Sequence, residues 1–309
     1  MKLLLTGSTG MLGRNLLDAL KTKKYDVLSP SRDVLDLLDF NKINIYLKDN
    51  KPDIIIHAAG CVGGIKANQN NQLMFFFENT LMGMNLVKAA YSHKILNFLN
   101  IASSCIYPSN FLTPIKEDNL LDGKLEPTNE GYALAKISIL KMCEFISNKN
   151  SNFNYKTIIP CNLFGKYDTF EIESSHLLPA IILKIHNAIL NSHNKVEIWG
   201  DGKVKREFMY AEDCADALIH FIGIIDKIPQ NMNIGVNSDY SIYDYYKKVS
   251  DLLGYKGKFT FNQNMPNGIT RKKNNISLQK KFGWMPKYSL EEGILKTYQF
   301  YVKNYETRD

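Results

Sequence analysis

The chain has 309 residues, of which 45% are hydrophobic and 22% are charged. These fractions are ordinary for a folded globular protein and exclude a disordered or fibrous chain. The net charge of +7 is spread along the chain, which favours a solvated surface and anionic small-molecule ligands over a nucleic-acid partner.

The cysteines and the apolar runs bear on compartment and membranes. Five cysteines are scattered without a CxxC pair, which argues against a disulfide framework and against a zinc site. No run of eighteen apolar residues occurs, and the apolar N-terminal run is too short for a signal peptide. The sequence therefore predicts a cytoplasmic protein with no metal site and no membrane segment.

The first half of the chain alternates short apolar runs with helical patterns. Strands are predicted at Lys2–Thr6, Asp26–Leu28, Asp53–His57, Ile95–Ile101 and Tyr155–Pro160. Helices are predicted between them at Met11–Leu20, Asn41–Lys48, Phe75–Tyr91 and Tyr132–Ile146. Because strands that alternate with helices form βαβ units, this half predicts a doubly wound parallel sheet of the Rossmann type.

The alternation loosens after about residue 162. Helical patterns occur at His176–Ile189, Ala211–Ile222, Ile242–Leu253 and Leu290–Tyr301, mixed with short strands such as Val196–Trp199. The sequence therefore predicts an α/β fold of two lobes. Residues 1–165 would form a dinucleotide-binding lobe to which some later segments return, and residues 166–309 would form mainly a smaller substrate-binding α/β lobe.

A glycine-rich loop, GSTGMLG at 7–13, joins the first strand to the first helix. Glycines permit the tight turn and let the backbone approach a pyrophosphate, whose charge the helix N-terminus stabilises. The spacing is GxxGxxG rather than GxGxxG. Its position directly after the first strand favours dinucleotide binding over a helix-start turn without a ligand.

The end of the second strand bears on the choice of cofactor. An acidic residue there would bind the ribose hydroxyls of NAD, whereas an arginine would accept the 2′-phosphate of NADP. Arg32 favours NADP(H), and the adjacent Asp33 leaves NAD open.

Three residues carry the chemistry of an oxidoreductase. Ser103 follows the fourth predicted strand, and Tyr132 and Lys136 form a YxxxK motif on one helix face. An ammonium near a phenol lowers the phenol pKa, so the tyrosine could exchange a proton with a carbonyl or an alcohol near neutral pH. With the glycine loop upstream, the sequence predicts a nicotinamide-dependent oxidoreductase in which Ser103 holds the substrate oxygen.

Several segments make the chain resemble a known family along essentially its whole length. They are VGGIKAN at 62–68, SSCIYP at 103–108, EPTNEGYALAK at 126–136, NLFG at 162–165 and REF at 206–208. The chain resembles the GDP-L-fucose synthases, which belong to the extended short-chain dehydrogenase/reductases. The resemblance implies a homodimer that epimerises C3 and C5 of GDP-4-keto-6-deoxymannose and reduces its C4 ketone with NADPH.

The resemblance also implies a role for each matching residue. Tyr132 would be the acid for C4 reduction, Lys136 would bind the nicotinamide ribose, and Ser103 would bind the C4 oxygen. Cys105 would be the base of the epimerisation and His176 its acid. Cofactor contacts are implied at Gly7, Thr9, Gly10, Met11, Leu12, Gly13, Arg32, Ala58, Ala59, Tyr132, Lys136, Pro160, Asn162, Leu163 and His176. Substrate contacts are implied at Lys184, Trp199, Arg206 and Lys272.

Two alternatives stay open. The chain could be a C4 reductase only, acting on a related GDP-4-keto sugar such as a GDP-deoxyheptose in surface polysaccharide biosynthesis. It could also be a non-catalytic NADP-binding regulator, but such proteins usually lose part of the serine, tyrosine and lysine set, and all three residues are present here.

Overall fold

The computed structural model describes residues 1–111, 113–171, 175–264 and 269–305. Its centre is a six-stranded sheet in the order β10-β5-β4-β3-β1-β2, and every neighbouring pair is parallel. The strands are β1 (Lys2–Thr6), β2 (Asp26–Leu28), β3 (Ile54–His57), β4 (Asn97–Ile101), β5 (Asn154–Pro160) and β10 (Asn231–Ile234). The prediction of a doubly wound parallel sheet is confirmed.

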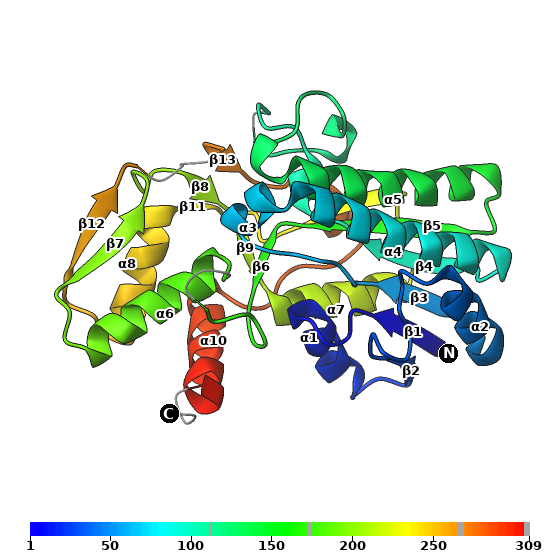
Figure 1. The fold of residues 1–309 in the computed structure, drawn as a ribbon, viewed down its shortest axis with the longest axis horizontal. Coiled ribbons are helices and arrows are strands. Elements are labelled where there is room, and N and C mark those ends of the chain that lie inside the picture. The colour runs from blue at the N-terminus through cyan, green and yellow to red at the C-terminus, as the bar shows by residue number, and fades with distance from the viewer. Residues whose placement is uncertain (112, 172–174, 265–268, 306–309) are drawn as a thin grey trace.

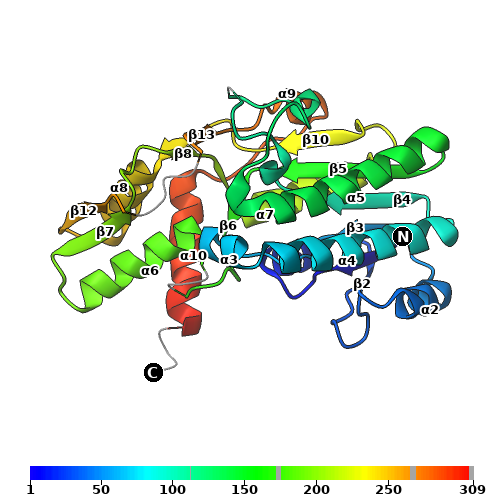
Figure 2. The same cartoon turned by 45° about the horizontal axis from the view of Figure 1, so that its top comes forward.

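Helices cover both faces of this sheet (Figure 1). One face carries α1 (Met11–Leu20) and α7 (Ala211–Ile222), and the other carries α2 (Phe40–Asn50), α4 (Gln72–Ser92) and α5 (Glu130–Lys149). Successive strand residues point to opposite faces, so Leu3 and Leu5 pack with α1 and α7 whereas Leu4 packs on the other side. This double burial explains the unbroken apolar runs Leu3–Leu5 in β1 and Ile54–Ile56 in β3. Figure 2 shows α4 and α5 running side by side along their face.

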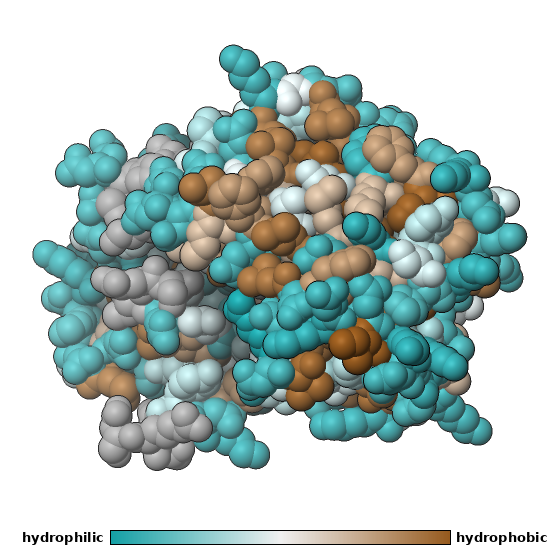
Figure 3. Space-filling model, turned by 45° about the vertical axis from the view of Figure 1, so that its right-hand side comes forward, coloured by the Kyte–Doolittle hydropathy of each residue, from teal (hydrophilic) through white to brown (hydrophobic). Residues whose placement is uncertain are grey.

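The outer surface of α4 and α5 carries exposed hydrophobic side chains, here named the α4–α5 apolar stripe. Its members are Leu73, Phe77, Leu81 and Met84 of α4 and Leu134 and Phe145 of α5. On α4 they recur at intervals of three and four residues, which places them along one side of the helix. Figure 3 shows hydrophobic side chains, in brown, gathered on the upper part of the face that this view presents.

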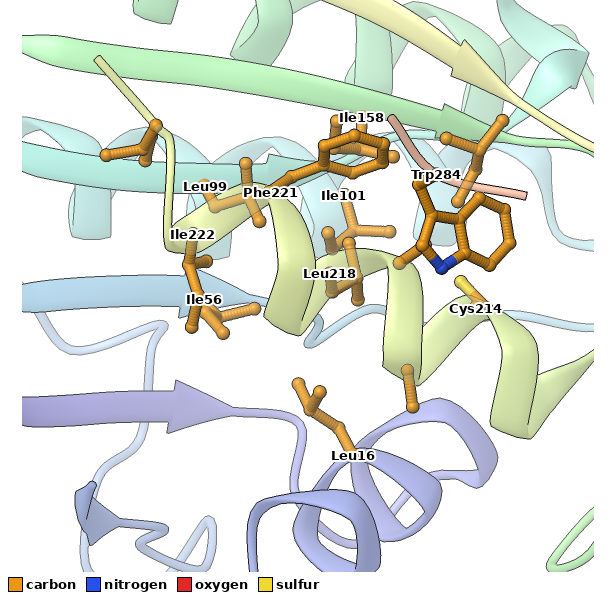
Figure 4. Packing of buried hydrophobic residues seen from close by; sticks show 14 of the residues in the cluster. Leu16, Ile56, Leu99, Ile101, Ile158, Cys214, Leu218, Phe221, Ile222 and Trp284 are labelled. Carbon is orange, nitrogen blue, oxygen red and sulfur yellow. The ribbon is translucent and has the colours of Figure 1, made fainter. Parts of the chain in front are cut away.

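The core beneath the sheet includes residues from late in the chain (Figure 4). Strand residues Ile56, Leu99, Ile101 and Ile158 meet Leu16 of α1, Leu218, Phe221 and Ile222 of α7, and Trp284. The indole nitrogen of Trp284 donates a hydrogen bond to Oδ2 of Asp216 at 2.8 Å, which satisfies its polar group at the core boundary. Thus β10, α7 and Trp284 lie with the first sheet although they follow residue 165. The two-lobe division at that residue stays a prediction.

A second group of elements packs beside the sheet. Its helices are α6 (Leu177–Leu190), α8 (Ile242–Leu253) and α10 (Leu290–Tyr305), which share one hydrophobic core. Its strands are β7 (Lys195–Trp199) with β12 (Lys258–Asn262), and β8 (Lys205–Arg206) between β11 (Tyr240–Ser241) and β13 (Arg271–Lys272). Between the groups, β6 (Asn162–Phe164) pairs with β9 (Phe208–Tyr210).

Shorter helices complete the described chain. They are α3 (Ile65–Asn70), α9 (Ser277–Lys281) and three 3-10 turns, η1 (Ser104–Ile106), η2 (Glu117–Asn119) and η3 (Pro127–Asn129). Within the described ranges, no helix is both long enough and apolar enough to cross a membrane.

Some predicted elements are longer in the structure. The helix predicted from Phe75 begins at Gln72, and the helix predicted from Tyr132 begins at Glu130. Gln72 joins these two starts, because its Nε2 donates to the carbonyl oxygen of Pro127 at 2.7 Å and its Oε1 accepts the N–H of Gly131 at 3.1 Å. A bond between distant segments leaves no trace in the local pattern of either one.

Candidate active site

The glycine loop forms a tight turn between β1 and α1. Gly7 has φ +74°, and the Gly10 N–H donates to its carbonyl oxygen at 3.1 Å. A Cβ on Gly7 would lie 2.5 Å from the backbone nitrogen of Ala59, and a Cβ on Gly13 would collide with the Gly7 carbonyl. No side chain caps the start of α1, so its first N–H groups remain available for an anion.

A pocket opens at the carboxyl ends of β1 and β3, between which the strand order reverses, as ligand sites in open α/β sheets do. Six predicted cofactor residues line it: Gly7, Thr9, Gly10, Arg32, Ala58 and Ala59. Met11, Leu12 and Gly13 form the first turn of α1 beside it. Other residues that line the pocket were not predicted from the sequence, namely Thr6, Ser8, Pro30, Leu35, Asp36, Leu37, Gly60, Cys61, Glu78 and Met82. Leu35 and Leu37, which follow the second strand, are apolar. They were the sequence signal for a hydrophobic side of the pocket against which a flat base of the dinucleotide could pack.

Arg32 and Asp33 differ in their relation to this pocket. Arg32 lines it, with a largely exposed side chain whose Nε lies 3.9 Å from Oδ1 of Asp36. Asp33 is outside the set of described residues that line the pocket. A guanidinium at this position suits a phosphate group. The glycine turn, the uncapped helix start and Arg32 together fit NADP(H).

Tyr132 and Lys136 lie where β4 ends. Both belong to α5, and the Nζ of Lys136 is 5.7 Å from the centre of the Tyr132 ring. The same Nζ donates to the carbonyl oxygen of Ile101, the last residue of β4, at 3.1 Å. Ser103 follows two residues later and caps the start of the turn η1, where its Oγ accepts the Cys105 N–H at 3.4 Å. The serine, tyrosine and lysine of the predicted set therefore meet at one strand end.

Burial sets the protonation of this group. It raises the pKa of the Tyr132 phenol well above its ordinary value and lowers the pKa of Lys136 to about 8. The predicted lowering of the phenol pKa is therefore wrong, because burial of the phenol oxygen raises it and the charges of Cys105 and Cys61 act in the same direction. The phenol is protonated at neutral pH, which is the form that an acid must have before a carbonyl is reduced.

His57 ends β3 beside the lysine and stays neutral. It is 1% exposed, and its Nδ1 shares a 2.9 Å hydrogen bond with the Thr6 hydroxyl. Burial, with the charge of Lys136, lowers the pKa of His57 to about 3. The neutral imidazole therefore links the ends of β1 and β3 and adds no positive charge to the site.

Cys105 lies buried in η1 among cationic side chains. Burial raises the pKa of its thiol, whereas Lys272, the Ser103 hydroxyl and Lys136 favour the thiolate. Lys272 is only 8% exposed, and in the register of β13 with β8 it stands opposite Arg206. The structure thus brings two predicted substrate residues, Lys272 and Arg206, to the neighbourhood of the predicted base.

His176 directly precedes α6 and faces a carboxylate. Its Nδ1 lies 3.6 Å from Oδ1 of Asp168, which is 4% exposed. Asp168 raises the pKa of His176, although burial opposes the shift. The protonated imidazole is therefore favoured, which suits the predicted acid. The partner of this histidine, Asp168, ends the NLFGKYD segment at 162–168. The sequence showed that segment, but the role of Asp168 beside His176 was not predicted from it.

The remaining predicted residues occupy two places. Pro160 ends β5, and Asn162 and Leu163 begin β6, where the Asn162 side chain donates to the Glu207 carbonyl oxygen at 2.9 Å. Lys184 and Trp199 form a separate pair on α6 and β7, with the Lys184 Nζ 5.0 Å from the indole centre. The Lys184 Nζ also donates to the Glu197 carbonyl oxygen at 3.2 Å.

Comparisons with known proteins identify the family and agree with the fold. The model of the NAD dependent epimerase/dehydratase family matches residues 3–235. A GDP-L-colitose synthase of Yersinia pseudotuberculosis is 51% identical over 302 residues, which are 98% of each chain. A GDP-L-fucose synthase of Azorhizobium caulinodans is 43% identical over 99% of this chain and 97% of its own. The solved structure of a GDP-mannoheptose C4 reductase from Campylobacter jejuni with NADP bound is 28% identical, covers 97% of this chain and 98% of its own, and has a TM-score of 0.88.

Proposed function

Since the chain belongs to the NAD dependent epimerase/dehydratase family, with full-length relatives among the GDP-L-fucose and GDP-L-colitose synthases, we propose that it is an NADPH-dependent enzyme that reduces the C4 ketone of a GDP-4-keto-6-deoxy sugar. Epimerisation next to the ketone precedes the reduction. The observation that carries the proposal is the meeting of Ser103, Tyr132 and Lys136 at the end of β4, next to the pocket at the reversal of strand order.

The reductive step needs three actions from the chain. NADPH, when bound, supplies the hydride. The Ser103 hydroxyl orients the C4 oxygen, and the protonated phenol of Tyr132 donates its proton to that oxygen as negative charge develops there. Lys136 holds a positive charge beside the phenol, so it stabilises the phenolate left after proton transfer.

The epimerisation step needs a base and an acid on opposite faces of the sugar. Protons on carbons next to a ketone are acidic, because the electron pair left behind is delocalised onto the carbonyl oxygen. Burial raises the pKa of the Cys105 thiol and the charge of Lys272 opposes that shift; Cys105 acts as the base in its thiolate form, which removes such a proton and becomes a thiol. The His176 imidazolium, favoured by Asp168, returns a proton to the other face and becomes neutral.

Two further candidates differ from the first in the sugar. The relative at 51% identity is a GDP-L-colitose synthase, and colitose is fucose without the hydroxyl at C3. The structural neighbour is a GDP-mannoheptose C4 reductase, which keeps the reductase-only alternative on a GDP-deoxyheptose open. All three candidates share the GDP group and the C4 ketone, and they differ at C3, at C6 and in the need for epimerisation.

Turnover trials in deuterated water separate these candidates. The chain is incubated with NADPH and, in turn, with GDP-4-keto-6-deoxymannose, its 3-deoxy analogue and a GDP-4-keto-6-deoxyheptose, and the products are read by NMR. Deuterium beside C4 in a reduced L-sugar is expected. Reduction without deuterium beside C4 leaves the reductase-only function, and no NADPH oxidation with any of the three overturns the proposal.

We further propose that the α4–α5 apolar stripe is the contact of a homodimer and that the enzyme works in the cytoplasm. Phe77, Leu81 and Phe145 expose large apolar side chains on two adjacent helices, a pattern that favours a partner surface. The free cysteines, of which Cys61 is the most accessible, suit a reducing compartment.

A further inference from the structure

Glu207 is a buried carboxylate between strands β8 and β9. It stands between Arg206, which ends β8, and Phe208, which begins β9, and its exposed fraction is 0%. Among the described residues, no cation forms an ion pair with it within 4.0 Å. A buried charge without a counter-ion is costly unless hydrogen bonds satisfy it.

Three backbone N–H groups satisfy this carboxylate. Its Oε1 accepts from Val236 and from Asn237, both at 2.8 Å, and its Oε2 accepts from Asn274 at 2.8 Å. The carboxylate also lies against Gly235, where a Cβ would come within 2.6 Å of Oε1. One side chain therefore joins its own segment to the loop after β10 and to the segment after β13.

The segment after β13 is itself fixed to the central sheet. The Asn274 side chain donates to the carbonyl oxygens of Ile159 in β5 and Ile234 in β10, at 3.1 and 3.2 Å. Asn274 is bonded to two strands of the sheet. Its hydrogen bond to Glu207 therefore fixes the position of β8 relative to β5 and β10.

The joined segments are those that carry the cations of the sugar-nucleotide site. Arg206 is the neighbour of Glu207, and Lys272 lies two residues before Asn274 and opposite Arg206 in the β8–β13 register. The Arg206 guanidinium is oriented in addition by donation to the carbonyl oxygen of Ile269 at 2.6 Å. A change in the hydrogen bonds of Glu207 would therefore alter the distance between Arg206 and Lys272, the two cations that face the same ligand.

We propose that Glu207 is a positioning residue that sets the register of Arg206 and Lys272 so that together they clamp the diphosphate of the sugar nucleotide. This inference rests on the proposed function for the identity of the ligand. Only a carboxylate offers acceptors on both oxygens. The amide of a glutamine would turn an NH2 group toward at least one of the three N–H donors.

The test compares binding of GDP with binding of NADPH. In Glu207→Gln, the dissociation constant of GDP should rise about tenfold, since a buried donor loses its acceptor near the site, while that of NADPH stays within about twofold. In turnover, KM for the GDP sugar should rise more than kcat falls. Asp213→Asn is the matched control, because Asp213 is a buried carboxylate that accepts the Lys287 and Tyr288 N–H groups away from both cations. It should lower the melting temperature without a selective loss of GDP.

A second variant approaches the same contact without removing the charge. Gly235→Ala should displace the carboxylate and reproduce the selective loss of GDP affinity, which also covers the case in which Glu207→Gln does not fold. In an Arg206→Ala background, Glu207→Gln should cost little further GDP affinity.

The outcomes distinguish the two proposals. If the unaltered chain binds NADPH but not GDP, the proposed function falls and this inference falls with it. If the unaltered chain binds GDP, and Glu207→Gln binds it equally well or loses GDP and NADPH in equal measure, the positioning role is wrong while the proposed function stands.

Discussion

Lys136 holds its charge where water hardly reaches it. The side chain is 4% exposed, and its Nζ donates to the carbonyl oxygen of Ile101 at 3.1 Å. Burial lowers its pKa to about 8 from an ordinary value of 10.5. The ammonium is the form that stabilises a phenolate at Tyr132, so its titration falls within the range in which enzymes are assayed.

The first prediction concerns pH. We expect kcat/KM for NADPH to fall as pH rises through about 8, because Lys136 loses its proton there. In Lys136→Arg, whose guanidinium stays charged, the falling limb should leave the assayed range even though the rate is low. Initial rates across pH measure both profiles, and an unchanged limb in the arginine variant would assign the titration to another group.

Folding stability should respond to the same titration with the opposite sign. Above the folded pKa of about 8, the unfolded chain, with its ordinary value of 10.5, binds more protons at this site than the folded chain does. The contribution of Lys136 to stability therefore rises with pH between the two values. A fall in activity in this pH range is therefore not caused by unfolding at this site. Denaturant titrations at several pH values measure the free energy of unfolding and check this expectation.

The second prediction concerns Cys105. Cys105→Ser should slow exchange of the protons beside the C4 ketone by about a hundredfold or more, because a hydroxyl is a much weaker base than a thiolate. Exchange is followed by NMR in deuterated water without NADPH, and NADPH affinity serves as the control. Exchange at the unaltered rate would remove Cys105 from the epimerisation.

The sequence predicted that Tyr132 and Lys136 lie together, but it did not predict the direction of the phenol pKa shift. The YxxxK spacing placed Tyr132 and Lys136 on one helix face, and the structure shows them adjacent. The direction of the phenol pKa was wrong, because it depends on burial by segments that are remote in sequence. Glu207 stood inside the REF segment, but its three N–H partners lie 29, 30 and 67 residues away.

At the scale of elements, the turn between β1 and α1 depends on two glycines. Gly7 has a left-handed backbone, and an added Cβ there would collide with the backbone of Ala58 and Ala59, which follow β3. Gly13 lets the first turn of α1 approach the Gly7 carbonyl. The turn therefore joins two neighbouring strands and the helix start at the cofactor pocket.

The third prediction tests this turn. Gly7→Ala should weaken NADPH binding at least tenfold, because the left-handed conformation costs about 1–2 kcal/mol and the new methyl displaces Ala59. Gly254→Ala is the control: Gly254 has φ +80° and no atom within 4 Å of an added Cβ, so it should lose stability alone. Equal NADPH affinity in the two variants would contradict the account.

Predicted and observed elements agree best where one helix or strand has its own repeat. The predicted bounds of β1, α1, α7 and α8 match the structure. The two-residue strands β8 and β13 were not predicted, because two residues carry no periodicity and these strands are defined by pairing between remote segments, β8 with β11 and β13 with β8. Those strands carry Arg206 and Lys272, so local patterns could not show how the substrate cations meet.

At the scale of the whole molecule, the cofactor pocket and the cations of the proposed substrate site belong to different groups of elements. Glycine loop residues line the pocket of the parallel sheet, whereas Arg206 and Lys272 lie on the small sheet of β11, β8 and β13. The chain links the two groups more than once, because β10 pairs with β5 and α7 packs on the same parallel sheet although both come late in the sequence. The α4–α5 apolar stripe lies on the outer side of these two helices, and α5 also carries Tyr132 and Lys136.

The fourth prediction concerns assembly. Phe77→Asp should convert a dimer into monomers, because a charge in the middle of an apolar contact cannot be solvated there. Leu190→Asp is the control, since Leu190 is similarly exposed but lies at the end of α6, away from the stripe. Light scattering after gel filtration gives the mass of each variant, and a monomeric unaltered chain would refute the proposed contact.

The most direct test of the central claim is the rate of NADPH oxidation by Tyr132→Phe with GDP-4-keto-6-deoxymannose. Phenylalanine keeps the ring and its packing and removes only the proton donor. We predict a loss of about 100- to 10,000-fold in kcat while NADPH binds as tightly as before. Unchanged turnover in this variant would contradict the assignment of Tyr132 as the acid and, with it, the proposed mechanism of reduction.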